Sequence, residues 1–256
     1  MAQPKQWSKE VLKREELITQ RKQRLQIQKP PKFPRGTPQF NFEINGQIIG
    51  FQHIPKCAGT SVKLMLMEAA GIDWRNTPVS DWGKPTRERK YTAAQLKTYL
   101  MRHKPRRDIE GNHIPCDIKF TVIRDPIERV KSIFTNRVLY HGKGRFINRD
   151  FNRFMNYFPR FADGDLIHHS RKYVHFLNNE PETWDRVFIS SEVDKIAEWL
   201  SELSGKDIKP MRKQTGGSEH KDKIALTQDH INKIKDWHKE DYEFWWNKKV
   251  VPQAFE

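Results

Sequence analysis

The chain has few cysteines, no long apolar run and no repeated segment. Its 256 residues include two cysteines, Cys57 and Cys116, too few for the disulfide framework of a small secreted domain. No stretch approaches the ~20 consecutive apolar residues of a transmembrane helix, and the first residues lack the apolar core of a secretory signal. These absences predict a cytoplasmic, soluble protein with reduced thiols, unless a membrane anchor has been removed.

Acidic residues are also scarce. The chain has 32 Asp and Glu against 47 Lys and Arg, a formal net charge of +15. Such an excess says little about the fold, but it predicts attraction to anions such as nucleic acid, an anionic membrane, an acidic polysaccharide or a polyanionic cofactor. The length is sufficient for one large α/β domain with its own core.

The first 38 residues differ in composition from the rest. They hold ten Lys and Arg against three Glu, and four prolines between 30 and 38 oppose regular structure there. We therefore predict a basic N-terminal arm over residues 1–38 and a single α/β domain over 39–256. The arm either contacts an anionic partner or forms a solvated helix on the edge of the domain.

The pattern around residues 48–71 predicts a strand, a tight loop and a helix. An apolar run over 48–54 leads into the loop, apolar positions crowd residues 62–67, and Gly71 is a helix stop signal. The loop between them points main-chain N–H groups at the helix N-terminus, where the helix dipole favours an anion. A phosphate or sulfate group fits this chemistry.

The side chains of the loop suit an anion as well. Gly59 allows close approach of the main chain, Lys56 adds a mobile positive charge, and Thr60 and Ser61 add hydroxyl donors. The loop is not a Walker A motif, in which Lys directly precedes Ser or Thr near the end of the loop. The alternative is an ordinary strand-to-helix turn with one surface lysine.

A second segment places an arginine at the end of a buried strand. The apolar pattern predicts a strand over 118–123, so Arg124 stands at its carboxyl end, where open α/β sheets bind ligands. Pro126 suits the first turn of a following helix, and Ser132 lies two turns into it. An arginine and a hydroxyl so placed can clamp a phosphate. Taken alone, Arg124-Asp125-Pro126 is a weak signal for such a site, and a surface ion pair between Arg124 and Asp125 is the more usual interpretation.

Two strings resemble a known family. His53-Ile-Pro-Lys-Cys-Ala-Gly-Thr-Ser61 closely resembles the 5′-phosphosulfate loop of sulfotransferases that use 3′-phosphoadenosine 5′-phosphosulfate (PAPS), in particular the carbohydrate sulfotransferases of the Golgi type and their soluble bacterial relatives. Arg124-Asp-Pro-Ile-Glu-Arg-Val-Lys-Ser132, about 70 residues later, resembles the family's 3′-phosphate motif, RDPxxRxxS. One departure is Cys57-Ala58, where the common form has Thr-Gly.

The resemblance spans roughly residues 45–247 and implies a P-loop-like three-layer α/β fold with a central, mainly parallel sheet flanked by helices. It implies PAPS as donor, a hydroxyl acceptor on a carbohydrate, possibly an acidic glycan, and no metal. Lys56 would stabilise the leaving phosphate oxygen, and Arg124 and Ser132 would hold the 3′-phosphate. The remaining contacts to the 5′ end would come from Cys57, Ala58, Gly59, Thr60 and Ser61.

The resemblance also implies a general base and a late nucleotide contact. His113 occupies the place of the histidine that is the candidate base in the carbohydrate enzymes, although Asn112 replaces the usual Gly before it. Its unperturbed pKa near neutrality suits proton transfer. Arg212 and Lys213, in a polar stretch where sulfotransferases close a loop over the nucleotide, are candidates for phosphate or adenosine contacts.

Two other classes of function stay open at this point. A P-loop nucleotide kinase is one, since residues 120–125 pass for a Walker B strand, but the missing Walker A motif argues against it. A non-catalytic nucleic-acid-binding protein is the other, using the basic arm and the aromatic, basic stretch 141–175. This stretch could instead line a cleft for an acidic sugar. Many of its aromatic residues are expected in the core, since Phe151, Phe154, Met155 and Phe158 follow helical spacing. The acceptor and the oligomeric state are not specified by the sequence.

Local signals predict the remaining elements. Asn45-Gly46 between two apolar runs indicates a β-hairpin. Residues 184–190 read as another strand, followed by a helix over 191–203, and residues 226–242 as a last helix. A capping box at 92–95 predicts one more helix before Pro105.

Overall fold

The computed structural model describes residues 35–72, 115–211 and 224–250. These form two compact units. The sheet unit holds residues 36–72, 115–123 and 180–211, and the helical unit holds 124–179 and 224–250. Most of the predicted arm, the predicted helix at 92–100 and the candidates His113, Arg212 and Lys213 lie outside the described residues, so the boundary between arm and domain stays a prediction.

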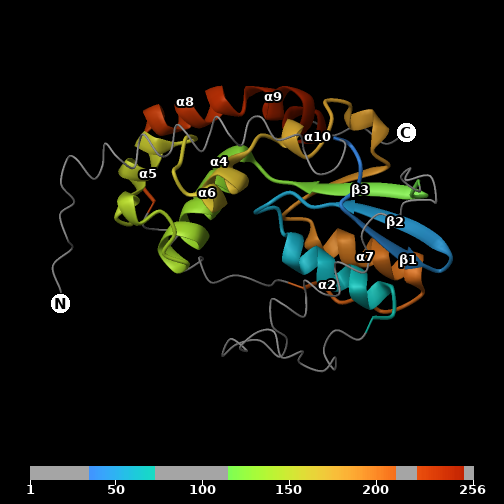
Figure 1. Ribbon diagram of the computed structural model, residues 1–256. Helices are drawn as coiled ribbons and strands as arrows, with labels where there is room; N and C mark the ends of the chain where they lie inside the picture. Colours follow the sequence, from blue (N-terminus) through green and yellow to red (C-terminus); the bar gives the residue numbers. More distant parts are fainter. Residues whose placement is uncertain (1–34, 73–114, 212–223, 251–256) are drawn as a thin grey trace, which may run out of the picture. The chain divides into compact units, whose positions relative to one another are not determined.

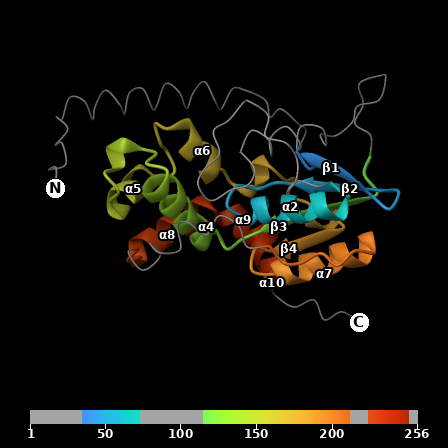
Figure 2. The same cartoon turned by 90° about the horizontal axis from the view of Figure 1, so that it is seen from below.

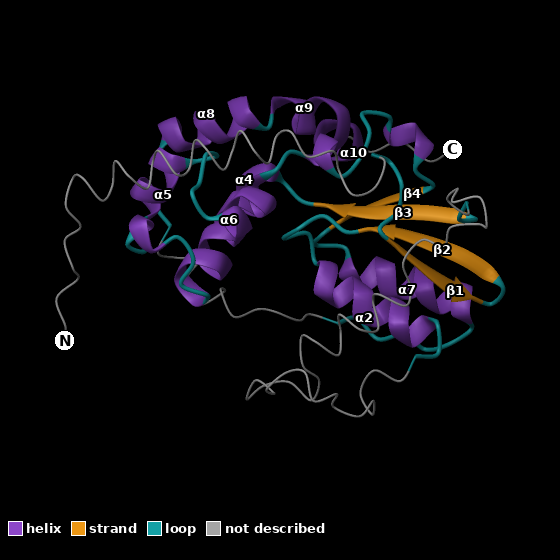
Figure 3. Ribbon diagram, viewed as in Figure 1, coloured by secondary structure: helices purple, strands orange, loops and turns teal. Residues whose placement is uncertain are grey.

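The sheet unit is built on four strands in the order β1 (Phe40–Ile44), β2 (Gln47–Gln52), β3 (Ile118–Ile123) and β4 (Arg186–Ile189). The first pair is antiparallel, and β2, β3 and β4 run parallel (Figure 3). Helices α2 (Gly59–Ala69) and α7 (Val193–Ser204) lie together against one face of the sheet (Figures 1 and 2). The predicted α/β class with a central, mainly parallel sheet flanked by helices is confirmed.

The predicted hairpin is present. Phe40 pairs with Phe51 and Ile44 with Gln47, and the turn consists of Asn45 at φ 48° and Gly46 at φ 78°. Positive φ at both central residues is the geometry of a type I′ turn, which matches the twist of the flanking strands. Local turn chemistry thus sets the register of β2, the strand that leads into the anion-type loop.

Aromatic stacking joins the sheet to its helices. The ring of Phe120 on β3 stands 4.9 Å from that of Phe51 on β2 and 4.9 Å from that of Trp199 on α7. All three side chains are buried. Pairs of this kind add to the burial of apolar area, so the two strands and α7 form one rigid support.

The helical unit consists of short helices. In chain order they are α4 (Pro126–Ile133), the π-helix η1 (Phe134–Tyr140), the 3₁₀ turn η2 (Arg145–Ile147), α5 (Phe151–Tyr157), α6 (Gly164–Ser170), the 3₁₀ turn η3 (Tyr173–His175), α8 (Gln228–Trp237), α9 (Lys239–Asp241), the π-helix η6 (Tyr242–Trp246) and α10 (Asn247–Val250). A further 3₁₀ turn, η4 (Pro181–Thr183), belongs to the sheet unit. The predicted helix after Pro126 is therefore present, but its second half is widened to a π-helix.

Phenylalanine dominates the core of the helical unit. Phe134, Phe154 and Phe161 are almost completely buried, with ring centroids 5.3 Å apart between the first two and 4.8 Å apart between the last two. Ile234 of α8 joins this cluster from the far end of the chain. The helical spacing of Phe151, Phe154, Met155 and Phe158 therefore reflects core packing, as predicted.

Among the described residues, no helix combines the length and the apolar character needed to cross a membrane.

Candidate functional site

The loop between β2 and α2 carries the first predicted motif. Two of its residues have left-handed main-chain conformations, Lys56 at φ 70° and Ala58 at φ 54°. The N–H of Cys57 between them donates to the carbonyl of Ile54 at 3.3 Å. Turns that alternate in this way draw successive main-chain N–H groups toward one side, a geometry that forms anion-binding concavities.

Ala58 is also the N-cap of α2, and its methyl side chain provides no cap. Its carbonyl accepts from the N–H of Val62 at 3.1 Å, which starts the helix. In the described part of the chain no side chain caps this helix, and its first turn has no acidic residue. With neither a side-chain cap nor an acidic residue in its described first turn, the start of α2 keeps the positive end of its helix dipole, which favours an anion.

Gly59 is required by a contact that the sequence did not reveal. A Cβ on residue 59 would stand 2.1 Å from Cδ2 and 2.3 Å from Nε2 of His53. The close approach that a glycine permits here is therefore to the imidazole at the other end of the loop. This contact brings the two ends of the loop together and helps to define its shape.

The other predicted loop residues differ in exposure. Lys56 and Thr60 are half-buried, whereas Cys57 and Ser61 are buried, at 1% and 3% exposure. The Cys57 thiol donates weakly to the carbonyl of Pro55 at 3.8 Å. Cys57 therefore contributes to the inner wall of the loop. The thiols of Cys57 and Cys116 are not joined in a disulfide.

The strand that precedes the second motif runs beside the strand that precedes the loop. In β2 and β3, Gln52 is paired with Thr121, whose hydroxyl donates to the Gln52 carbonyl at 3.0 Å. The carboxyl ends of these parallel neighbours therefore share one edge of the sheet, the edge at which α/β proteins bind ligands. Strand β3 ends at Ile123, the residue before Arg124.

The second motif begins α4. Asp125 is its N-cap, and its Oδ1 accepts from the N–H groups of Ile127 at 2.8 Å and Glu128 at 3.1 Å. Pro126 follows in the first helical position, where its missing N–H has no consequence. The acidic residue of Arg-Asp-Pro therefore caps a helix.

Arg124 and Ser132 lie toward the same face of α4. A guanidinium nitrogen of Arg124 lies 3.7 Å from Oε2 of Glu128, whose other oxygen is 2.6 Å from Nζ of Lys131. Ser132 is half-buried one turn beyond Glu128, and residues four apart share a helix face. Arg124 thus lies toward the face of α4 that carries Ser132.

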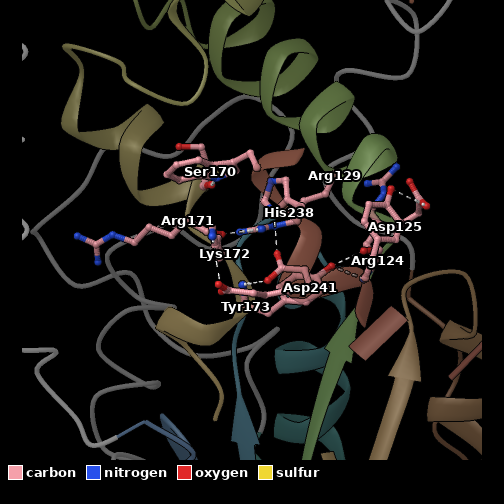
Figure 4. Close-up of polar contacts among 12 residues, drawn as sticks. Arg124, Asp125, Arg129, Ser170, Arg171, Lys172, Tyr173, His238 and Asp241 are labelled. Carbon is pink, nitrogen blue, oxygen red and sulfur yellow. Dashed lines mark hydrogen bonds and ion pairs between the residues drawn. The ribbon is translucent and has the colours of Figure 1, made fainter. Parts of the chain in front are cut away.

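The second arginine of the motif is structural. Arg129 is fully buried and donates to the carbonyls of Arg171 at 2.7 Å and His169 at 2.9 Å. Its guanidinium carbon is also 5.2 Å from the centroid of the Tyr173 ring. Arg129 therefore holds the segment between α6 and η3 against α4 (Figure 4).

Tyr173 in turn contacts the main chain of Arg124. Its hydroxyl accepts from the Arg124 N–H at 3.0 Å and donates to the Arg124 carbonyl. The N–H of Tyr173 donates to Oδ1 of Asp241 at 2.8 Å, and Oδ2 of Asp241 lies 2.6 Å from Nδ1 of His238. Burial lowers the pKa of His238, an effect that the Asp241 carboxylate opposes. The imidazole is therefore neutral and donates through Nδ1–H.

Tyr242, in the π-helix η6, contacts the second motif directly. The hydroxyl of Tyr242 donates to Oδ2 of Asp125 at 3.4 Å. Burial, followed by the nearby Asp125 carboxylate, raises the pKa of Tyr242, so its phenol stays protonated as a donor. No local pattern in the sequence marks Tyr173, Asp241 or Tyr242 as partners of the motif.

A family model for the sulfotransferase family matches residues 45–245. The match includes the loop at 53–61, the motif at 124–132 and Tyr242, whose hydroxyl contacts that motif. This chain belongs to the sulfotransferase family. The predicted membership is confirmed, and with it a transferase that carries sulfuryl groups. Searches of the curated proteins and of the solved structures gave no match.

Proposed function

We propose that this sulfotransferase transfers the sulfuryl group of PAPS to a carbohydrate hydroxyl by in-line displacement. The observation that carries the proposal is the loop after β2. It combines left-handed turns at Lys56 and Ala58 with a helix N-terminus that no side chain caps among the described residues. Such a loop favours a phosphate or sulfate group, and the family match supplies the reaction class.

At the donor's 5′ end, the loop would bind through its main chain. The N–H groups from Ala58 to Ser61, with the Thr60 and Ser61 hydroxyls, would hold the phosphosulfate. The Cys57 N–H, which donates to the Ile54 carbonyl, would contribute only by sharing that hydrogen bond. The Lys56 ammonium would stabilise the negative charge that grows on the leaving phosphate oxygen. Sulfuryl transfer of this type depends on positioning and on charge stabilisation rather than on covalent help from the protein.

At the donor's 3′ end, the proposed partners are Arg124 and Ser132. A guanidinium presents a planar pair of donors to a phosphate, and the serine hydroxyl adds a third. The position of both residues toward the same face of α4 supports this role. Recognition of a 3′-phosphate is also what would distinguish PAPS from ATP. The same proposal includes His113 as the base and Arg212 and Lys213 as further nucleotide contacts.

The charge of the helical unit supports an acidic acceptor. Several basic side chains between η1 and α6 are exposed, namely Lys143, Arg145, Arg149 and Arg160. Exposed charges of one sign attract an oppositely charged polymer from solution and raise its rate of association. An acidic glycan is therefore the acceptor class we propose.

Calorimetric titration with adenosine 3′,5′-bisphosphate, the product of sulfuryl transfer from PAPS, tests the donor assignment. We expect the wild type to bind the bisphosphate more tightly than AMP or ATP, and Arg124→Ala to lose this preference. Lys195→Ala, which removes an exposed lysine of α7, is the control for net charge. Incubation with sulfur-labelled PAPS and acidic or neutral glycans then identifies the acceptor.

Two results would overturn the proposal. Preference for ATP with magnesium would point to a phosphotransferase. Equal, salt-sensitive binding of all three nucleotides and of oligonucleotides would indicate a non-specific electrostatic surface.

A further inference from the structure

The main chain of Arg124 is held by one side chain. Its N–H donates to the Tyr173 hydroxyl at 3.0 Å, and its carbonyl accepts from the same hydroxyl. A single phenol thus pairs with both main-chain polar groups of the residue that starts the second motif (Figure 4). Since a phenolic oxygen has one proton and two lone pairs, this double contact fixes the rotation of its O–H bond.

Tyr173 is itself fixed from several directions. It is fully buried, its N–H donates to Asp241, and the Arg129 guanidinium lies over its ring at 5.2 Å. Arg129 also bonds the carbonyl of Arg171, two residues before Tyr173. The phenol is therefore anchored at its ring and at its main chain, which leaves its hydroxyl little freedom to move.

The Asp241 carboxylate that anchors Tyr173 is nearly inaccessible, at 1% exposure, and the His238 imidazole that it accepts from is at 0%. In the helical unit the Nε2 atom of His238 has no hydrogen-bond partner. A buried polar atom without a partner is costly, so the arrangement persists because the other contacts determine it. The four residues form one chain of contacts that leads from His238 through Asp241 and Tyr173 to Arg124.

We propose that Tyr173, anchored by Asp241 and His238, is a positioning residue that sets the main chain of Arg124 for recognition of the donor's 3′-phosphate. This inference rests on the proposed function. The guanidinium of Arg124 reaches its ligand from a main chain whose position the Tyr173 hydroxyl determines. Small displacements of a bidentate donor weaken its contact with an anion strongly, since both hydrogen bonds depend on one geometry.

Tyr173→Phe tests the inference because it removes one oxygen atom and keeps the ring that Arg129 covers. We would titrate wild type and variant with adenosine 3′,5′-bisphosphate and with AMP, which lacks the 3′-phosphate. The expected result is about tenfold weaker binding of the bisphosphate, with AMP binding unchanged. Tyr140→Phe is the matched control, since Tyr140 lies in the same unit and is 49% exposed. It should bind both nucleotides as the wild type does.

A merely structural role for Tyr173 predicts a different pattern. Equal weakening of both nucleotides, or unchanged binding of both, would overturn the inference and leave the proposed function standing. A wild type that does not prefer the bisphosphate to AMP would overturn the proposed function and this inference together. Should Tyr173→Phe fail to fold, Asp241→Asn is tested by the same ratio, the affinity for the bisphosphate divided by the affinity for AMP. A ratio equal to that of the wild type would then refute the positioning role of Tyr173.

Discussion

The imidazole of His53 lies against the Cα of Gly59, so that a Cβ on residue 59 would stand 2.1 Å from it. Gly59→Ala must therefore displace the imidazole, the loop or the start of α2. We expect a loss of about 1–3 kcal/mol in the free energy of unfolding, as for other overpacked sites. Bisphosphate affinity should fall by about tenfold or more in the same variant.

Removal of the imidazole tests the cause of that loss. In the double variant His53→Ala, Gly59→Ala the added methyl group has room, so part of the stability and affinity should return. The wild type, the single variants His53→Ala and Gly59→Ala, and the double variant form a cycle. Equilibrium unfolding and bisphosphate titration of these four proteins give the coupling energy between residues 53 and 59. Strictly additive effects would show that the contact between residues 53 and 59 is not responsible.

Ala58 adopts φ 54° at a position where the family's common form has glycine. A left-handed conformation is unfavourable for an L-residue by about 1–2 kcal/mol, and the greater freedom of glycine in the unfolded chain offsets part of any gain. Ala58→Gly should therefore raise the free energy of unfolding by about 0.5–1 kcal/mol. Ala70→Gly, at φ −74°, is the control and should lower it or leave it unchanged.

Lys56→Ala should lower the rate of sulfuryl transfer by about 10²-fold, because the ammonium would stabilise charge that develops in the transition state. The variant retains a Cβ at the same left-handed position, so the main chain should change little. His113→Ala should lower turnover by a similar factor of about 10² if His113 is the base. Near-normal turnover of PAPS with the preferred acceptor would remove either residue from its proposed role.

In the proposed site, Glu128 would compete with the 3′-phosphate for the Arg124 guanidinium, which lies 3.7 Å from its carboxylate. Glu128→Gln removes this ion pair and one negative charge, so binding of the bisphosphate should tighten by about threefold. Glu198→Gln on α7 makes the same change in net charge at an exposed position and is the control. Equal tightening in both variants would mean that only the overall charge matters.

Burial lowers the pKa of His169 to about 4, and its Nδ1–H donates to the Asp165 carbonyl at 2.7 Å. In the unfolded chain the pKa is near 6.5. As the pH falls, the His169 imidazole therefore takes up a proton in the unfolded protein before it does so in the folded protein. The free energy of unfolding is highest above pH 6.5 and decreases as the pH falls toward 4. Between pH 7 and 5 the loss should be up to about 2 kcal/mol.

Denaturant unfolding at both pH values measures this effect. His169→Gln should show a smaller loss over that interval than the wild type, whereas His141→Gln, at an exposed position, should show the same loss. An unchanged pH dependence in His169→Gln would mean that His169 is not responsible.

Elements whose causes are local could be predicted from the amino-acid sequence. Asn45-Gly46 produces the hairpin turn, Gly71 stands in a left-handed conformation two residues after α2, and Pro126 starts α4. Each depends on the intrinsic φ preference of one or two residues, which a neighbouring stretch of sequence reveals. The two motifs, read with these elements, were enough to predict the α/β class and the family.

The surroundings of the two motifs depend on contacts between residues far apart in the chain. Tyr173 follows Arg124 by 49 residues, and Asp241 follows Tyr173 by 68. The sequence grouped Tyr173 with residues that line an acceptor cleft or form the core, and nothing near it marks its hydroxyl as a partner of Arg124. Contacts between residues so far apart arise from the packing of whole helices, and local propensity does not encode them. For the same reason, burial made one arginine of the second motif, Arg129, structural and left the other, Arg124, beside Glu128.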